Sequence, residues 1–333
     1  MEYRDLLEQL IRAHGPSGDE EDVCQVIQRN VPATVDEVTV DVMGNLIVHQ
    51  KGNGPKVMLA AHMDSVGIIV THIEKNGFLR FGALGGLEPK AIYQAPVRFR
   101  NGVGGVIAVN ENKAEKEFKL TDLYLDIGAA DETEARNLVA VGDTAVFAAP
   151  ILKNGTRLIS PCLDNRAGCV ALLAVMQQVK NPVNDLYFVF TAQEEVGLRG
   201  AKPVSWSLEP DYALVVDVTC PDDVPGALHE GTTAVGKGTA IKVMDHSMIA
   251  HLAMVAQLSR LADEIGITVQ KDLLKVGGTD AGAVHVSRSG VLTGGVSIPC
   301  RYTHTPTELI DQTDLEACVE LIRAFCESEL VRR

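Results

Sequence analysis

The chain has 333 residues and a formal net charge of −14 at pH 7, and its length allows one large domain or two. Hydrophobic residues make up 46% and charged residues 22%, which is typical of a globular protein. Nucleic acids and anionic membranes attract clustered lysine and arginine, so the acidic balance argues against both as partners. The most apolar stretch, 57–73, is interrupted by His62, Asp64 and His72, so we expect neither a membrane span nor a signal peptide.

The seven cysteines are an odd number, are scattered along the chain and include no Cys-X-X-Cys pair. A disulfide framework or a zinc knuckle would show closer, paired spacing. We therefore expect reduced thiols, most of them buried, in a cytoplasmic protein.

The first third of the chain begins with helical periodicity. Leucine and isoleucine spaced as a buried stripe predict a helix within residues 1–14, and Ser17 with Glu20 three residues later predicts a capping box for a second helix. Short strands at 38–42 and 46–49 carry a hairpin signal between them. A further strand at 56–61 leads directly into His62.

The pattern changes between about residues 66 and 158. Short alternating runs separated by glycine, asparagine and aspartate predict a small β barrel or sandwich. A single helix is expected at 131–137, and the charged run 111–117 is expected to be an exposed loop. The alternating runs are 67–73, 78–81, 96–99, 103–109, 123–127 and 144–148.

Helix and strand alternate again after residue 158. This alternation predicts an α/β domain that is interrupted by the β segment. We expect helices at 165–179, after Val196, at about 247–265 and at 313–330, and strands from Leu186, at 212–218, near 241 and 269, and at 291–298.

A buried strand that ends in two acids is the strongest local sign of chemistry. Residues 186–191 are nearly all apolar and are followed by Glu194 and Glu195, and open α/β sheets bind ligands at the carboxyl ends of such strands. Neighbouring side chains of an extended segment point in opposite directions, so one acid could hold a metal while the other transfers a proton. The alternative is a solvated loop whose acids favour the N-terminus of the next helix.

Five segments far apart in the sequence place a possible metal ligand after a predicted strand or in a loop containing glycine or proline. Carboxylates and imidazoles suit divalent cations, and a bridging carboxylate can hold two ions about 3.5 to 4 Å apart. Taken singly, a histidine here could be a packed side chain and an aspartate could cap a helix. The candidate residues are His62 with Asp64, Asp164, Glu194 with Glu195, Asp217, and His304.

Asp64 lies two residues after His62. Residues at this spacing share one face of a strand, so the carboxylate is expected to accept a hydrogen bond from the second ring nitrogen of His62. Such a contact fixes the tautomer of a metal-bound histidine.

In this order, and with a β domain between the first two, the five segments resemble the tetrahedral (TET-type) aminopeptidase family of peptidase clan MH, which includes glutamyl and deblocking aminopeptidases. The resemblance spans essentially the whole chain and extends to 277–282 and 297–308. It implies a three-layer α/β/α catalytic domain formed by residues 1–66 and 158–333. It also implies that residues 67–157 form an inserted, PDZ-like β barrel used in dimerisation and assembly.

The resemblance further implies the activity and the site. It implies removal of N-terminal residues from short peptides with a free amine, by a water molecule activated by two divalent ions, zinc or cobalt. It implies a homo-oligomer in which dimers assemble into a tetrahedral dodecamer. By the same resemblance, His62 and Asp217 hold one ion, Glu195 and His304 hold the other, Asp164 bridges them, Glu194 is the general base and Asp64 orients His62.

Other classes of function remain open at this point. A glycoside hydrolase could use Glu194 and Glu195 as its acid pair, but adjacent residues rarely flank a sugar bond, and aromatic content is only 5%. A non-catalytic, metal-stabilised assembly protein would not need a proton acceptor such as Glu194. A deacylase or carboxypeptidase on the same scaffold would differ in not requiring a free amine on its substrate.

Overall fold

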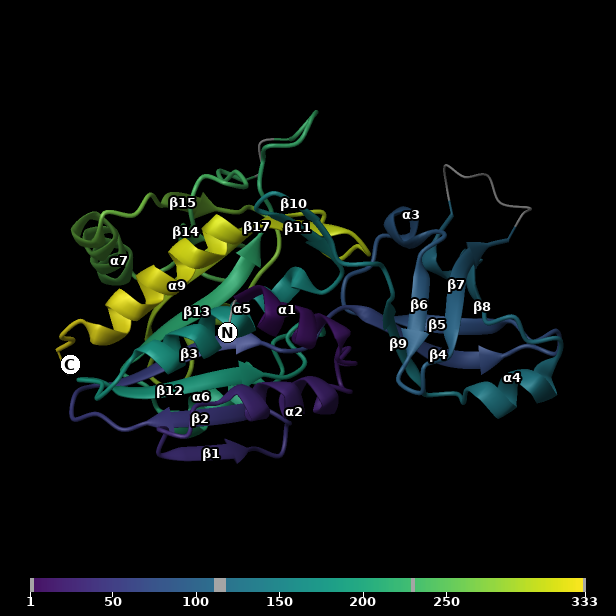
Figure 1. Cartoon of the computed structure of the whole chain (residues 1–333), viewed down its shortest axis with the longest axis horizontal. Coiled ribbons are helices and arrows are strands. Elements are labelled where there is room, and N and C mark those ends of the chain that lie inside the picture. Colours follow the sequence, from purple (N-terminus) through teal and green to yellow (C-terminus); the bar gives the residue numbers. More distant parts are fainter. Residues whose placement is uncertain (1–2, 111–117, 229–230, 332–333) are drawn as a thin grey trace.

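The computed structural model describes residues 3–110, 118–228 and 231–331, which form two bodies side by side (Figure 1). Within these residues, one body is built on an eleven-stranded mixed sheet and the other is a closed barrel of six strands. The predicted α/β class and the inserted barrel are therefore confirmed. The charged run 111–117 lies outside the described residues.

The large sheet has a parallel centre. β12 (Asp185–Thr191), β3 (Lys56–His62), β13 (Tyr212–Thr219) and β16 (Leu292–Arg301) run parallel in this order, and nearly all of their residues are buried. Strands with both faces covered are expected to be this apolar. The flanking strands are β1 (Glu37–Val40), β2 (Leu46–Gln50), β10 (Leu152–Asn154), β11 (Arg157–Ser160), β14 (Ala240–Met244), β15 (Gln270–Leu273) and β17 (Glu308–Asp311).

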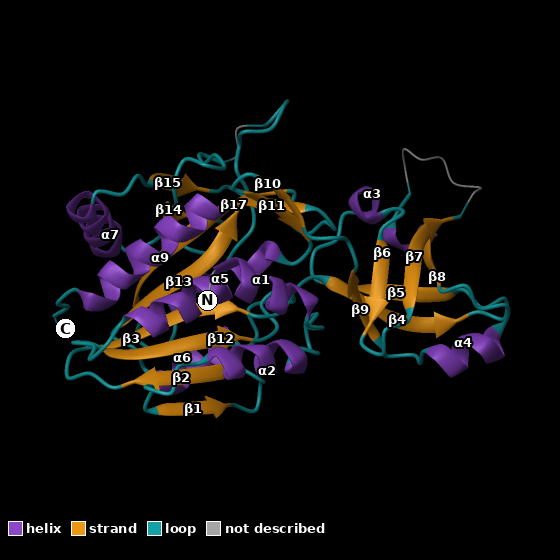
Figure 2. Ribbon diagram, viewed as in Figure 1, coloured by secondary structure: helices purple, strands orange, loops and turns teal. Residues whose placement is uncertain are grey.

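Helices cover both faces of this sheet (Figure 2). On one face, α5 (Leu163–Gln178) packs against β3 and β13, and its own outer side is covered by neighbouring helices, so nearly all of its residues are buried. The opposite face carries the short helices α6 (Ala201–Leu208) and α8 (Ala281–Val284). The other helices of this body are α1 (Tyr3–Arg12), α2 (Glu21–Asn30), α7 (Leu252–Ile265) and α9 (Gln312–Glu327).

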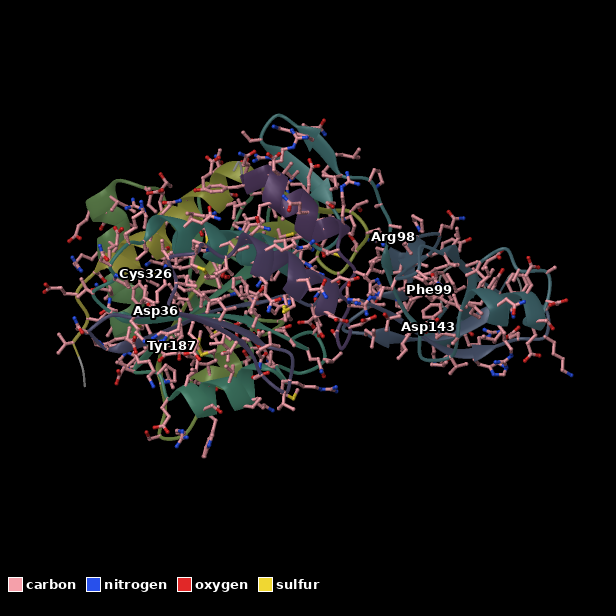
Figure 3. The ribbon with its side chains drawn as sticks, turned by 60° about the horizontal axis from the view of Figure 1, so that its bottom comes forward. Asp36, Arg98, Phe99, Asp143, Tyr187 and Cys326 are labelled. Atoms are coloured by element: carbon pink, nitrogen blue, oxygen red, sulfur yellow. The ribbon has the colours of Figure 1, made fainter. Side chains whose placement is uncertain are left out.

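The barrel has a hydrophobic core of its own. Its buried side chains, such as Phe99, Ile107 and Leu125, cluster apart from those that pack on the large sheet. Figure 3 shows Arg98, Phe99 and Asp143 in this body, away from Tyr187 and Cys326 in the other. The barrel elements are β4 (Gly67–Ile73), β5 (Leu79–Leu84), β6 (Pro96–Phe99), β7 (Gly104–Val109), β8 (Leu123–Asp126) and β9 (Thr144–Phe147), with α3 (Pro89–Ile92), the 3-10 turn Leu120–Asp122 and α4 (Glu132–Leu138).

The chain enters and leaves the barrel beside the large sheet. Val66 precedes β4 and packs into the barrel core, while β10 and β11 pair with each other after β9 and join the large sheet through β17. The sequence pattern did not predict β10, β11 and β17. Their short segments include lysine, asparagine and arginine, and they are strands because neighbouring strands pair with them.

Polar contacts hold the barrel against the body of the large sheet. Arg100, at the end of β6, contacts carboxylate oxygens of Asp19, Glu21 and Asp22 at 2.6 to 3.2 Å. The Arg98 guanidinium donates to the carbonyl oxygen of Arg12. Because these contacts lie at the start of α2 and the end of α1, they tie the barrel to the N-terminal helices.

His14 lies buried at the same junction. Its Nε2 is 2.8 Å from Thr144 Oγ1 of the barrel and 3.1 Å from Asp19 Oδ2, and the Thr144 hydroxyl donates to the same Asp19 oxygen. Burial lowers the pKa of His14 more than the nearby Asp19 carboxylate raises it. The folded protein therefore holds this imidazole neutral at pH values where the unfolded chain has already taken up a proton.

This arrangement predicts that the His14 contribution to stability is present above about pH 6.5, the ordinary histidine pKa, and is lost as the pH falls. Glutamine keeps a polar side chain but does not titrate, so His14→Gln is expected to lose stability less steeply than wild type between pH 8 and pH 5. Urea unfolding of both proteins across this range measures the difference. Identical pH dependence in wild type and His14→Gln would contradict this prediction. It would show that the pKa of His14 is the same in the folded and the unfolded state.

Among the helices of the described residues, none combines the length and the apolar character that a membrane crossing requires.

Candidate metal centre

The candidate residues meet where the parallel strands of the large sheet end. His62 is the last residue of β3 and is paired in register with Thr191, the last residue of β12. Asp217 lies near the end of β13, and Glu195 follows β12. The carboxyl ends of parallel strands share one edge of a sheet, which is why residues so distant in sequence converge. Asp164 at the start of α5 and His304 between β16 and β17 complete the group.

Imidazole nitrogens and carboxylate oxygens face one another across the centre. His62 Nε2 lies 3.2 Å from Asp164 Oδ1 and 3.4 Å from Asp217 Oδ1. His304 Nε2 lies 3.5 Å from Asp164 Oδ2 and 3.1 Å from Glu195 Oε2. Asp164 therefore presents one oxygen to each histidine, as a bridging carboxylate does.

The donor set fits divalent cations. Ligand atoms of His62, Asp164 and Glu195 all lie within 4.8 Å of one another. Among the described residues, Glu195 Oε1 and Asp280 Oδ1 are buried without a hydrogen-bond partner, and buried polar atoms are normally satisfied. Imidazole and carboxylate donors suit zinc, cobalt and related ions.

The charges of the centre depend on these short contacts. Burial would lower the pKa of His304, but Asp164 and Glu195 outweigh it and raise the pKa to about 12. Burial would raise the pKa of Asp164, but contacts with His304 and His62 lower it. Burial also raises the pKa of Glu194 well above its usual value, although His62 opposes the shift. A cation bound here would meet a site in which carboxylates outnumber imidazoles.

Asp64 organises the loop that carries the two adjacent acids. Its Oδ1 accepts from the backbone N–H of Glu194 at 2.9 Å, and its Oδ2 accepts from the N–H of Glu195 at 3.2 Å. His62 Nδ1 lies 3.5 Å from Asp64 Oδ1 and 3.1 Å from the Asp64 backbone oxygen. The hydrogen bond of His62 Nδ1 therefore goes to the Asp64 backbone oxygen rather than to the expected carboxylate, and the carboxylate fixes the positions of Glu194 and Glu195.

The predicted capping box of Ser17 and Glu20 is wrong. Helix α2 begins without a side-chain cap. The Ser17 hydroxyl instead donates to Asp64 Oδ2 at 2.6 Å, and Glu20 Oε1 accepts from the N–H groups of Gly18 and Gln193. Both residues support the acidic loop, because Ser17 binds Asp64 and Glu20 binds the backbone of Gln193, both distant in sequence, instead of capping the helix.

Glu194 and Glu195 line the same cavity. We expected an extended segment that directs the two acids oppositely. Instead Gln193 has φ +56° and the chain turns, with the Gly197 N–H donating to the backbone carbonyl oxygen of Glu194. The cavity has a volume of about 430 Å³ and is also lined by His62, Asp164, Asp217 and His304. Apolar and small residues also line it, among them Leu198, Leu274, Val276, Gly277 and Thr279.

Glu308 was not assigned a role from the sequence, although it lies in the 297–308 stretch. Its side chain is buried at the start of β17, where Oε2 accepts from the Asp164 N–H and Oε1 accepts from the His304 N–H, both at 2.9 Å. One carboxylate therefore holds the backbones of two candidate ligands. A lone glutamate at a strand start gives no local signal of such a role.

Glu308→Gln is expected to weaken ion binding by about 10- to 100-fold, the usual loss when an outer support of a ligand is removed. Glutamine has one acceptor oxygen, so one of the two N–H groups would face an amide donor, which costs about 1–3 kcal/mol of stability. Competition with a chelator of known affinity measures the first effect and thermal unfolding the second. The matched control is Glu316→Gln on the exposed side of α9, and equal affinities in the two variants would contradict this role.

Comparison with known proteins decides the family. A model of the M42 glutamyl aminopeptidase family matches residues 44–321. The chain belongs to this family. The M42 chain is 31% identical to a lysyl aminopeptidase of Pyrococcus furiosus, over 97% of this chain and 96% of that protein.

Solved structures agree with the assignment to M42. An aminopeptidase of the archaeon Desulfurococcus kamchatkensis matches with a TM-score of 0.94 and 37% identity, covering 98% of this chain and 94% of that one. The TET1 peptidase of Pyrococcus horikoshii, described as assembling into a tetrahedron or a large octahedral shell, matches with a TM-score of 0.88 and 32% identity, covering 97% and 99%. This M42 protein is a peptide hydrolase of the aminopeptidase type, and the predicted family is confirmed.

Proposed function

We propose that this M42 protein is a two-ion metallo-aminopeptidase that removes N-terminal residues from short peptides, with Glu194 as the general base. The observation that carries the proposal is the convergence of His62, Asp164 and Glu195 within 4.8 Å in a cavity that Glu194 also lines. Neither a glycoside hydrolase nor a non-catalytic scaffold needs this set of metal-binding side chains, and the M42 family match also favours a peptidase.

Each ion has a distinct set of supporting residues in this proposal. His62 and Asp217 would hold one, Glu195 and His304 would hold the other, and Asp164 would bridge them, in keeping with the contacts of its two oxygens. When bound, zinc or cobalt ions lower the pKa of a water molecule and polarise the scissile carbonyl. Asp64 would keep His62 in place and fix the acidic loop through its two backbone contacts.

Glu194 would move the proton. Its carboxylate lines the cavity, and burial raises its pKa from the usual value toward the range in which a side chain can both take up and give back a proton. It would accept a proton from the attacking water and deliver that proton to the amine that leaves when the peptide bond breaks. The water is thus consumed, and the products are a free amino acid and a shortened peptide.

Carboxylates that hold no ion support selection of a free N-terminus. Two bound ions would offset the charge of the ligand carboxylates, but Glu194 and Asp245 also line the cavity and can attract a protonated α-amine, whereas an acetylated terminus is neutral. The test is to incubate one short peptide in both forms and to follow its mass. Stepwise loss of N-terminal residues from the free form alone is expected, and internal cleavage, or equal cleavage of both forms, would contradict the proposal.

We further propose that residues 67–157 act as an inserted domain that contributes to assembly of this chain into dimers and a tetrahedral dodecamer. Support comes from the separate core of the barrel and from the likeness to the TET1 peptidase, which is described as forming closed shells. Sedimentation of the full chain is expected to give a mass about twelve times that of one chain. A monomer mass would contradict the proposed assembly without affecting the proposed chemistry.

A further inference from the structure

His304 is placed less securely than the other histidine of the centre. It lies on the loop between β16 and β17 with φ +62°, and 37% of its side chain is exposed. The side chain of His62, at the end of a buried strand, is 2% exposed. A ligand on an exposed loop needs contacts from outside that loop to keep one orientation.

The contact that orients His304 comes from the barrel. The segment that follows β5, Gly85–Leu87, reaches the centre, and the Gly86 carbonyl oxygen accepts from His304 Nδ1 at 2.9 Å. A carbonyl can only accept, so Nδ1 must carry a hydrogen, and Nε2 is the ring nitrogen that would bind an ion. Nε2 is the atom that faces Asp164 and Glu195.

Gly85 places the same segment against Glu195. A Cβ at position 85 would lie 3.2 Å from Glu195 Cβ and 2.7 Å from Val66 Cγ1, and the residue has φ +87°. Both the crowding and the left-handed backbone favour glycine at this position. The segment therefore touches both residues that are proposed to hold one of the two ions.

The other half of the centre is built without the barrel. His62 and Asp217 belong to neighbouring parts of the large sheet, and the His62 backbone oxygen accepts from the Cys169 thiol of α5. No described residue of 67–157 is within hydrogen-bonding distance of either side chain in the contacts that the structure shows. The two halves thus differ in what supports them.

We infer that the inserted barrel is a positioning element of the metal centre, and that the Gly86 carbonyl and the close approach of Gly85 set the affinity of the ion held by Glu195 and His304. This inference rests on the proposed two-ion function. It predicts that the two ions respond unequally to changes in the barrel. The ion held by His62 and Asp217 keeps its affinity, while the other weakens.

The barrel is suited to this role because its segment is anchored at both ends. Leu87, directly after Gly86, packs against the barrel core, and Gly85 directly follows β5. The barrel itself is tied to the N-terminal helices through Arg100. A displacement of the barrel would therefore move the Gly86 carbonyl away from His304.

The test is to titrate cobalt into chelator-treated wild-type and Gly85→Ala proteins and to count bound ions. Wild type is expected to bind two ions, and Gly85→Ala is expected to lose about 10-fold or more in the affinity of one of them, as for removal of a ligand's outer support. Gly128→Ala is the matched control, since Gly128 has φ +77° in the barrel and a Cβ there would meet no atom within 4 Å. It carries a similar backbone strain away from the centre.

A second variant keeps the inference testable should Gly85→Ala not fold. Leu87→Ala shortens the anchor in the barrel core and does not enter the centre, and it is expected to weaken the same single ion to a smaller extent. Ring-nitrogen magnetic resonance of His304 should show hydrogen on Nδ1 in wild type and a change in the folded variant. Equal loss of affinity for both ions, or unchanged affinities in the folded variants, would overturn the inference. If the wild-type protein is active and binds two ions, the proposed function still stands. A wild-type protein that binds no ions would overturn both.

Discussion

Glu194→Gln is expected to slow peptide hydrolysis by about 10²- to 10⁴-fold, the usual contribution of a positioned general base, while both ions remain bound. Glutamine has nearly the same shape as glutamate but cannot accept a proton from water. The backbone N–H of residue 194 would still donate to Asp64, so the loop that presents Glu195 should keep its position. Steady-state rates on a free dipeptide, together with a metal count for the same sample, measure both parts of this expectation.

Glu37→Gln is the matched control for this variant, because Glu37 lies exposed on the edge strand β1. It makes the same chemical change far from the centre and should leave the rate unchanged. A Glu194→Gln protein with near wild-type turnover would refute the assignment of the base. A variant that loses its ions along with its activity would assign Glu194 to metal binding instead.

Asp164→Asn is expected to weaken both ions, because each oxygen of Asp164 faces a different histidine. An amide has one oxygen and no charge, so it cannot bridge two cations. The loss should exceed the about 10- to 100-fold effect of removing an outer support, and activity should fall with it. Cobalt titration and rate measurements of the same samples test this, with Asp263→Asn on the exposed face of α7 as control. Loss of one ion alone would show that Asp164 is not a ligand of both ions.

The sequence predicts those features of the fold and site that local patterns encode. Apolar runs that end in polar residues identified β3, β12 and β13, and the polar residues that follow them converge because parallel strands end at one edge. The alternating runs between β4 and β9 predicted the barrel because each strand has one face in its core.

Local patterns failed where partners come from distant segments. Ser17 and Glu20 match a capping box by spacing, yet they bind Asp64 and the backbone of residues 18 and 193. The roles of Glu308 and Gly86 also depend on contacts across the fold, with Asp164 in the first case and His304 in both. Spacing along the chain cannot reveal such contacts, because they exist only after the sheet and the barrel are in place.

The inserted barrel is proposed to take part in both assembly and chemistry. A segment of the barrel contacts His304 and Glu195, and the same body is proposed to take part in contacts between copies of the chain. Any contact that shifted the barrel would then lower the affinity for the ion held by Glu195 and His304 and leave the affinity for the other ion unchanged. The matched glycine variants separate this effect from a general loss of stability.

The most direct test of the two-ion mechanism is to strip the protein with a chelator and measure dipeptide hydrolysis as zinc or cobalt is returned in known amounts. A two-ion centre is expected to show negligible activity without metal and full activity only when two ions are bound per chain, with no cleavage of the N-acetylated dipeptide at any point. Full activity in the stripped protein, or activity that is complete with one ion, would contradict it.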